Sequence, residues 1–169
     1  EENNYDTIVH LLGSNNIGDA EKDLKSSIDK NLLSIQNVAR FCTQHAKIIF
    51  LSSASVYGKS VSPIDEYSEP SPINIYGLLK YSSELELLKI VNERNMDYVI
   101  IRCFSVYTGL VNRLIIGKLY DSYLNSKKVT LYNTGQYRDY IHIDDFCRII
   151  EFIILERTIR NETFNVGSG

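Results

Sequence analysis

Three short runs of mostly apolar residues divide the chain, at residues 6–12 (DTIVHLL), 47–52 (KIIFLS) and 97–104 (DYVIIRCF). Runs that are apolar throughout are typical of parallel strands buried on both faces of a sheet. Two longer segments lie between them, and their apolar positions recur every three or four residues, as on one face of a helix. The order strand, helix, strand, helix, strand predicts an α/β fold with helices covering a parallel sheet.

The two helical segments are residues 20–44 and 74–94. The expected apolar stripe of the first consists of Leu24, Ile28, Leu32, Ile35 and Ala39. That of the second consists of Leu78, Tyr81, Leu85, Leu88 and Val91.

After residue 104 the pattern changes to shorter elements. We expect a helix at 112–126, strands at 129–132 and 138–143, a helix at 144–156 and a strand at 162–166. Asp144 or Asp145 is expected to cap the helix at 144–156, because aspartate is a favoured N-cap residue. No internal repeat or low-complexity linker divides the sequence.

Both ends of the chain bear on its organisation. A dinucleotide-binding α/β domain opens with a strand, a glycine-rich turn and a helix. No GxGxxG or GxxGxxG is present, and the last residues, 167–169, form a Gly-Ser-Gly sequence. We therefore expect a Rossmann-type sheet whose N-terminal glycine-rich unit is missing, which makes the chain a fragment of a longer protein.

Composition excludes several classes of protein. The net charge of −3 offers no broad basic field, so a nucleic-acid partner is not expected. No apolar run approaches the roughly 20 residues of a membrane span. Cys42, Cys103 and Cys147 are widely spaced and odd in number, which argues against a disulfide framework or a metal site. We expect buried or partly buried free thiols in a cytoplasmic protein.

Tyr76 and Lys80 are the first residues that indicate chemistry. Four residues apart on the second predicted helix, they lie one turn from each other on the same face. A phenol with a pKa near 10 is a poor base at neutral pH, and a neighbouring ammonium group favours its phenolate. An ordinary amphipathic helix would carry the same pair by chance, so the spacing alone is weak evidence.

Ser53 strengthens this interpretation. It ends the second predicted strand in the sequence LSSASVYG, and open α/β sheets bind ligands at the carboxyl ends of their strands. A hydroxyl group there can hydrogen-bond a substrate oxygen that gains or loses a proton.

The order of these motifs along the chain resembles the extended short-chain dehydrogenase/reductases, the NAD(P)-dependent epimerases, dehydratases and reductases of nucleotide sugars. The matching segments are DTIVHLLG, KNLLSIQNV, SSASVYG, YGLLK, IIRCFSVYTG, GQYRDYIHIDD and NVGSG. Together they extend over essentially the whole chain.

The resemblance implies roles for named residues. Tyr76 would be the general acid and base, Lys80 would lower its pKa and hold the nicotinamide ribose, and Ser53 would bind the reacting sugar oxygen. The residues implied to contact NAD, with NADP not excluded, are Leu11, Leu12, Gly13, Asn31, Ser52, Tyr76 and Lys80.

The substrate contacts implied by the resemblance are Ser53, Ser105 and Arg138. Arg138 would bind the diphosphate of the nucleotide sugar, and a salt bridge with Asp139 is the structural alternative. No residue is expected to bind a metal. Residues 1–104 would be the remainder of the dinucleotide-binding domain and 105–169 the substrate-binding part, of which 138–169 would return to pack on the Rossmann sheet.

Departures from the family pattern narrow the activity. The dehydratases carry an acidic pair after the serine position, where this chain has Ala54 and Ser55, so water elimination lacks its acid and base. Ser105 stands where the family has asparagine, Thr108 where it has glycine, and Leu12 where alanine is commoner.

We therefore predict an NAD(P)-dependent nucleotide-sugar epimerase, a homodimer that works through a keto intermediate. A ketoreductase of the same family is the first alternative. The alternative from another class is a non-catalytic binding or regulatory module, against which the joint presence of Ser53, Tyr76 and Lys80 argues.

Overall fold

A computed structural model describes residues 5–13, 17–60, 63–108, 115–131, 135 and 137–169. The chain divides into two compact units. The first consists of Glu1–Cys103 and Glu156–Asn165, and the second of Phe104–Leu155 and Val166–Gly169. The assignment of residues 1–104 to the cofactor and 105–169 to the substrate stays a prediction.

The sheet of the first unit contains the strands predicted from the apolar runs. Its order is β1 (Thr7–His10), β2 (Lys47–Ser53), β3 (Tyr98–Cys103) and β6 (Glu162–Val166). β2 pairs in parallel with β1 and with β3, and Ser52 of β2 lies opposite Arg102 of β3. The predicted fold class, α/β with a parallel sheet, is confirmed.

The first helical segment is broken, contrary to the single helix predicted at 20–44. It consists of α1 (Ile17–Lys22), α2 (Leu24–Ile28), a π-helical turn η1 (Asp29–Leu33) and α3 (Ser34–Phe41). The Asp23 side chain accepts a hydrogen bond from the Ser26 backbone N–H at 3.0 Å and caps α2. This cap starts a new helix at Leu24, because it provides an acceptor for the Ser26 N–H, which has no partner within the first turn of the helix.

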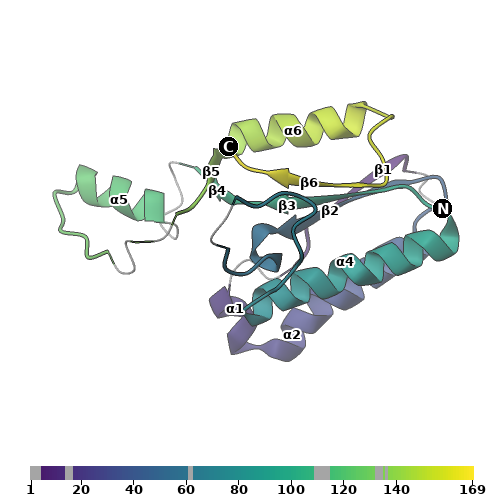
Figure 1. Cartoon of the computed structure of the whole chain (residues 1–169), viewed down its shortest axis with the longest axis horizontal. Coiled ribbons are helices and arrows are strands. Elements are labelled where there is room, and N and C mark those ends of the chain that lie inside the picture. The colour runs from purple at the N-terminus through teal and green to yellow at the C-terminus, as the bar shows by residue number, and fades with distance from the viewer. Residues whose placement is uncertain (1–4, 14–16, 61–62, 109–114, 132–134, 136) are drawn as a thin grey trace. The chain divides into compact units, whose positions relative to one another are not determined.

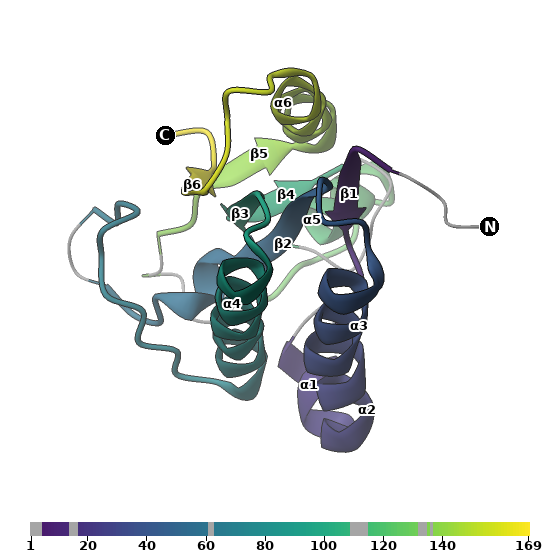
Figure 2. The same cartoon turned by 90° about the vertical axis from the view of Figure 1, so that its right-hand side faces the viewer.

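The long helix α4 (Ile75–Arg94) agrees closely with the prediction in its bounds. Asn74 caps its start by accepting the Gly77 N–H, and the left-handed Asn95 ends it. Figures 1 and 2 show α3 and α4 side by side on one face of the sheet.

The predicted buried stripe of α4 was wrong in part: Val91 is buried and Leu88 packs against the core, but other members do not. Leu78 and Leu85 are about half exposed, and the buried face contains Lys80, Glu84 and Leu87 instead. Two charged side chains therefore face the sheet, which a pattern of apolar positions cannot reveal.

An apolar core fills the space between the sheet and these two helices. Its members come from α3, β2, α4, β3 and the turn after α4: Ile35, Ala39, Ile48, Phe50, Leu87, Ile90, Val91, Met96 and Ile100. Full burial of each large side chain contributes roughly 1.5–3 kcal/mol, so this core supplies much of the unit's stability.

The second unit contains α5 (Ile115–Leu124), α6 (Ile143–Leu155) and a parallel pair of strands, β4 (Ser105–Tyr107) and β5 (Tyr140–His142). β4 was not predicted. Among the described residues 129–131 no strand forms, so the strand predicted at 129–132 was wrong there. Residues 112–114 of the predicted helix and residue 132 lie outside the described residues.

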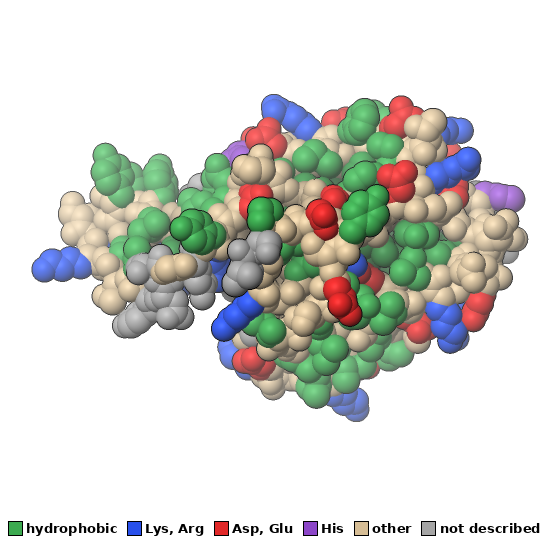
Figure 3. All heavy atoms as spheres, viewed as in Figure 1, with side chains coloured by type: hydrophobic (Ala, Val, Ile, Leu, Met, Phe, Trp, Pro, Cys, Tyr) green, Lys and Arg blue, Asp and Glu red, His purple; other side chains and the backbone are tan. Residues whose placement is uncertain are grey.

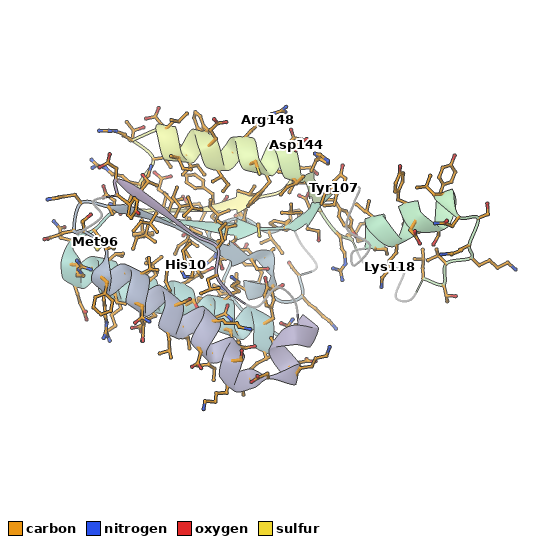
Figure 4. All side chains as sticks on the ribbon, turned by 180° about the vertical axis from the view of Figure 1, so that it is seen from behind. His10, Met96, Tyr107, Lys118, Asp144 and Arg148 are labelled. Atoms are coloured by element: carbon orange, nitrogen blue, oxygen red, sulfur yellow. The ribbon has the colours of Figure 1, made fainter. Side chains whose placement is uncertain are left out.

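The cap of α6 also differs from the prediction. The helix begins at Ile143, so Asp144 and Asp145 lie in its first turn. Their negative charges stabilise the helix by interacting with the positive end of its dipole. His142 takes the cap position instead, and its Nδ1 accepts the Asp144 N–H at 3.3 Å. Figure 4 shows Tyr107 near the start of α6, and its ring lies 5.2 Å from that of His142.

The described residues also bear on the expectations about membranes, metals and thiols. No helix among them is long and apolar enough to cross a membrane. Within the same residues no group of acidic, histidine or cysteine side chains could hold a metal ion. All three cysteines are free, as expected. Cys42 and Cys103 are partly buried, but Cys147 is exposed, so the prediction of burial was wrong for Cys147.

His10, the last residue of β1, has a buried side chain (Figure 4), whose Nε2 lies 3.0 Å from the Ser34 hydroxyl of α3 and whose ring lies 5.6 Å from that of Phe50. Burial, followed by the nearby positive charge of Lys80, lowers the pKa of His10 to about 4. The folded protein therefore keeps His10 neutral, while the unfolded chain takes up a proton below about pH 6.5.

We expect acid to destabilise the protein through His10. Between about pH 7.5 and about pH 5 this single group should remove roughly 2 kcal/mol from the free energy of unfolding. Denaturant titration of His10→Gln should lack this part of the loss, whereas the exposed control His45→Gln should retain it. An equal pH dependence in wild type and both variants would contradict the assignment.

Candidate active site

Ser53 ends β2 at the carboxyl edge of the sheet. Its side chain is buried, and its Oγ accepts the Ser55 N–H at 3.2 Å, which caps a single 3-10 turn at Ala54–Val56. Strand residues 48–51 before it are apolar, and Ala54 and Ser55 after it are small, so the chain leaves the core in a tight turn. This turn fixes the direction of the Ser53 hydroxyl group.

The first turns of α4 pack directly against this turn. A Cβ atom at Gly77 would overlap the Ser55 carbonyl oxygen and would lie 3.2 Å from Pro72. Only glycine permits the backbones to approach so closely. As a result the side chain of Tyr76, the neighbour of Gly77, lies close enough to Ser53 for that residue to affect its pKa.

Lys80 lies one helical turn after Tyr76, and only 5% of its surface is exposed. Its ammonium group donates to the Leu51 carbonyl oxygen at 2.9 Å and lies 5.3 Å from the centre of the Phe50 ring. Both partners belong to β2, so the lysine lies against the strand that carries Ser53.

Burial dominates the electrostatics of this pair. Burial raises the pKa of Tyr76, and hydrogen bonding with Ser53 lowers it by a smaller amount. Burial lowers the pKa of Lys80, and the charges of Cys103 and Glu84 raise it by a smaller amount. Both groups are thus shifted toward their neutral forms, and perturbed pKa values of this kind are common at functional sites.

Gly13 and Asn31 lie beside Lys80. A Cβ atom at Gly13 would be 2.8 Å from Asn31 Oδ1 and 2.9 Å from Lys80 Nζ. Asn31 is buried, and its Nδ2 donates to the Ser27 carbonyl oxygen at 2.7 Å. The absence of a side chain at Gly13 lets a cation and an amide lie close to the chain just after β1, and both groups can donate hydrogen bonds to a ligand there.

Two of the other residues predicted to contact the cofactor are exposed at the same edge. Leu11 and Leu12 follow β1 directly and are more than half exposed, as apolar residues that face a ligand would be. Ser52 is different, because it is buried and its hydroxyl group bonds the Glu84 carboxylate. Its predicted cofactor contact would therefore involve its backbone.

A buried polar network adjoins these residues, and sequence reasoning missed most of it. Arg102 Nη2 donates to Glu84 Oε2 at 2.7 Å, and Arg102 Nη1 donates to the Tyr57 hydroxyl at 2.8 Å. That hydroxyl donates to Asn165 Oδ1 at 2.8 Å. A charged residue inside the apolar run 97–104 was the one signal in the sequence for this network.

The predicted substrate residues Ser105 and Arg138 belong to the second unit. Ser105 begins β4, and its backbone N–H donates to the Asp139 carbonyl oxygen at 3.1 Å. The Asp139 carboxylate accepts the Ser168 N–H at 2.7 Å and the Gly169 N–H at 3.2 Å. Burial raises the pKa of Asp139, but these hydrogen bonds outweigh it and lower the pKa overall. The exposed Arg138 precedes this anchored residue.

Comparison with solved structures supports a Rossmann-type arrangement. MoeE5 in complex with UDP-glucose and NAD is 26% identical with a TM-score of 0.87, and the match covers 98% of this chain and 57% of that one. UDP-glucuronic acid 4-epimerase from Bacillus cereus, in complex with UDP-glucuronic acid and NAD, has the same identity and TM-score, covering 97% of this chain and 54% of the other.

Curated relatives agree with this likeness. UDP-glucose 4-epimerase of Mycoplasma genitalium is 27% identical over 97% of this chain and 56% of its own length. ADP-L-glycero-D-manno-heptose-6-epimerase of Brachyspira hyodysenteriae is 27% identical over 88% of this chain and 50% of its own. The chain thus spans about half the length of the relatives that it matches.

A family profile described as the NAD dependent epimerase/dehydratase family matches residues 1–167. The match extends over both units and confirms the resemblance drawn from the ordered motifs. The chain therefore belongs to the NAD dependent epimerase/dehydratase family.

Proposed function

We propose that this chain is the catalytic part of an NAD-dependent nucleotide-sugar epimerase. The observation that carries the proposal is the assembly of Ser53, Tyr76 and Lys80 at the carboxyl end of β2, next to Gly13. Relatives that are 26% and 27% identical, among them a UDP-glucose 4-epimerase, support a nucleotide sugar as substrate.

Gly13, Asn31 and Lys80 are the residues proposed to hold NAD. Leu11, Leu12, the backbone of Ser52, and Tyr76 complete the proposed contacts. When bound, NAD supplies the acceptor and donor of hydride that oxidation and re-reduction of a sugar carbon require. Gly13 lets Asn31 and Lys80 lie close to the end of β1, and Lys80 Nζ would donate to the ribose hydroxyl groups.

Tyr76 is proposed as the general base and, in the reverse direction, the general acid. As phenolate it accepts the proton of the sugar hydroxyl group while the carbon is oxidised. Lys80, one turn away, stabilises the phenolate by its positive charge, because burial otherwise raises the pKa of Tyr76. Ser53 hydrogen-bonds the same sugar oxygen and keeps it in line with Tyr76.

Ser53, Ser105 and Arg138 are the proposed substrate contacts. The forked guanidinium group of Arg138 suits a diphosphate, which it can bind through two parallel hydrogen bonds. The lack of an acidic side chain at Ala54 and Ser55 supports epimerisation over water elimination.

We also propose that the protein forms a homodimer through the exposed side of α4 and its neighbouring helices. Apolar side chains there are partly exposed: Leu24, Ile28, Leu33, Leu78 and Leu85. Figure 3 shows hydrophobic side chains gathered over α2 and the adjacent part of α4. A second copy of this face would cover them, and contiguous exposed apolar area of this kind marks interaction sites.

The three free cysteines support a cytoplasmic location.

Tyr76→Phe in the full-length protein should keep the fold and NAD binding but lower turnover about 10²- to 10⁴-fold, because only the proton-transferring hydroxyl group is lost. Ser53→Ala should cost less turnover, and Lys80→Met should weaken NAD binding as well. The pH–rate profile should show an alkaline group that is absent from Tyr76→Phe.

Steady-state assays with a nucleotide sugar and NAD measure the turnover of each variant, and analysis of the products identifies the reaction. An epimerase forms an isomeric sugar without net consumption of NAD, whereas a ketoreductase consumes reduced cofactor. Near-normal turnover of folded Tyr76→Phe enzyme would remove tyrosine from the mechanism.

Gly13→Ala should weaken NAD binding about tenfold or more, which corresponds to about 1.4 kcal/mol. The added methyl group would collide with Asn31 and Lys80, the proposed ribose contacts. Calorimetric titration with NAD measures the effect, and Gly135→Ala is the matched control, because a Cβ there meets no atom within 4 Å. Equal affinity of the two variants would place the cofactor elsewhere.

Arg138→Ala should raise KM for the nucleotide sugar about 10- to 100-fold, the scale of one charge-assisted hydrogen bond of about 1.5–3 kcal/mol. The affinity for NAD should change little, because the dinucleotide does not use this contact. If KM for the sugar is unchanged, Arg138 has a structural role only.

A further inference from the structure

Two opposite charges are buried in the first unit away from any ligand contact assigned above. Glu84 of α4 is 1% exposed and Arg102 of β3 is 7% exposed. They are joined by a bond of 2.7 Å between Nη2 and Oε2 and by contacts of 3.2 and 3.3 Å from Nε to the two carboxylate oxygens. Removing two charges from water is costly, and apolar residues of similar size often give equal or greater stability.

We propose that Glu84 and Arg102 are positioning residues, which hold Ser53, Tyr76 and Lys80 in the geometry that catalysis needs. The inference rests on the proposed function, since it assigns the pair to the same reaction. Neither residue is proposed to contact the sugar or NAD.

Glu84 connects the helix of the catalytic pair to the strand of the catalytic serine. It lies one turn after Lys80 on the buried face of α4, and its Oε1 accepts the hydroxyl group of Ser52, the residue before Ser53. Lys80 makes the second connection, to the Leu51 carbonyl oxygen at 2.9 Å. Two consecutive residues of β2 are thus bound to two consecutive turns of α4.

Arg102 fixes the turn on the other side of Ser53. It lies opposite Ser52 in the sheet register, and its guanidinium carbon is 4.8 Å from the centre of the Tyr57 ring. Its hydrogen bond to the Tyr57 hydroxyl extends through Asn165 Oδ1, and the Asn165 N–H donates to Glu66 in the loop before α4 at 2.8 Å. Side chains before and after Ser53, those of Ser52 and Tyr57, are therefore bound to the same ion pair.

The directional nature of these bonds is what an apolar replacement would lose. A buried methionine pair can fill the same volume, but it offers Ser52 only a weak sulfur acceptor in place of a carboxylate and offers Tyr57 no donor. Catalytic groups need to stay within about 0.5 Å of the productive arrangement, so a loosened strand end lowers turnover even in a stable protein.

The test uses the double variant Glu84→Met/Arg102→Met of the full-length protein, because a single substitution would leave one buried charge without its partner. We expect a folded protein whose Kd for NAD and KM for the sugar stay within about threefold of wild type, while kcat falls roughly 10- to 100-fold. The control is Asp145→Ala/Arg148→Ala, which removes an exposed ion pair of 3.0 Å and should leave kcat unchanged.

Normal kcat in the folded double variant would overturn the proposal. If the double variant does not fold, Ser52→Ala decides, since it removes only the hydroxyl group between Glu84 and β2: the proposal requires a lower kcat at unchanged KM for both ligands. Failure of the proposed function is recognised separately, because wild-type protein would then be as inactive as Tyr76→Phe.

A crystal structure of the double variant, or of Ser52→Ala, gives a readout that does not depend on activity. The proposal predicts that Tyr76 Oη shifts relative to Ser53 Oγ, or that Lys80 Nζ moves from its place at Leu51, by more than about 0.5 Å. An unchanged trio in the variant would overturn the proposal even if the enzyme assay gives no signal.

Discussion

The site depends on the close packing of the first turns of α4 against the end of β2. The absence of a side chain at Gly77 allows this contact, because any Cβ there would overlap the Ser55 carbonyl oxygen. Once the helix is in place, its buried face presents Tyr76, Lys80 and Glu84 at successive turns to β2. One steric constraint thus determines which residues meet Ser53, the Leu51 carbonyl oxygen and Ser52.

This arrangement makes α4 an unusual amphipathic helix. The face against the sheet contains an ammonium group and a carboxylate, whereas leucines such as Leu78 and Leu85 are half exposed. Each buried charge has a defined partner, which is the condition under which proteins tolerate buried charges. In the proposed mechanism the bonds that offset the cost of burial would also hold the catalytic geometry, so stability and proposed function would share the same contacts.

The sequence predicted the elements whose signals are local. Apolar runs located β1, β2 and β3 to within one or two residues, and the order of the motifs along the chain was enough to single out Ser53, Tyr76 and Lys80. It could not predict the face of α4, because burial of Lys80 and Glu84 depends on partners 18 to 32 residues away. It also missed the break at Asp23 and the cap at His142, where single side-chain hydrogen bonds override the helical pattern.

The central claim is that Ser53 and Tyr76 together hold one oxygen of a nucleotide sugar beside NAD. A crystal structure of the full-length protein with NAD and a nucleotide sugar tests it most directly, through the distances from Ser53 Oγ and Tyr76 Oη to the sugar. The account predicts that both lie within about 2.6–3.2 Å of the same sugar oxygen. A bound sugar whose hydroxyl groups contact neither side chain would contradict it.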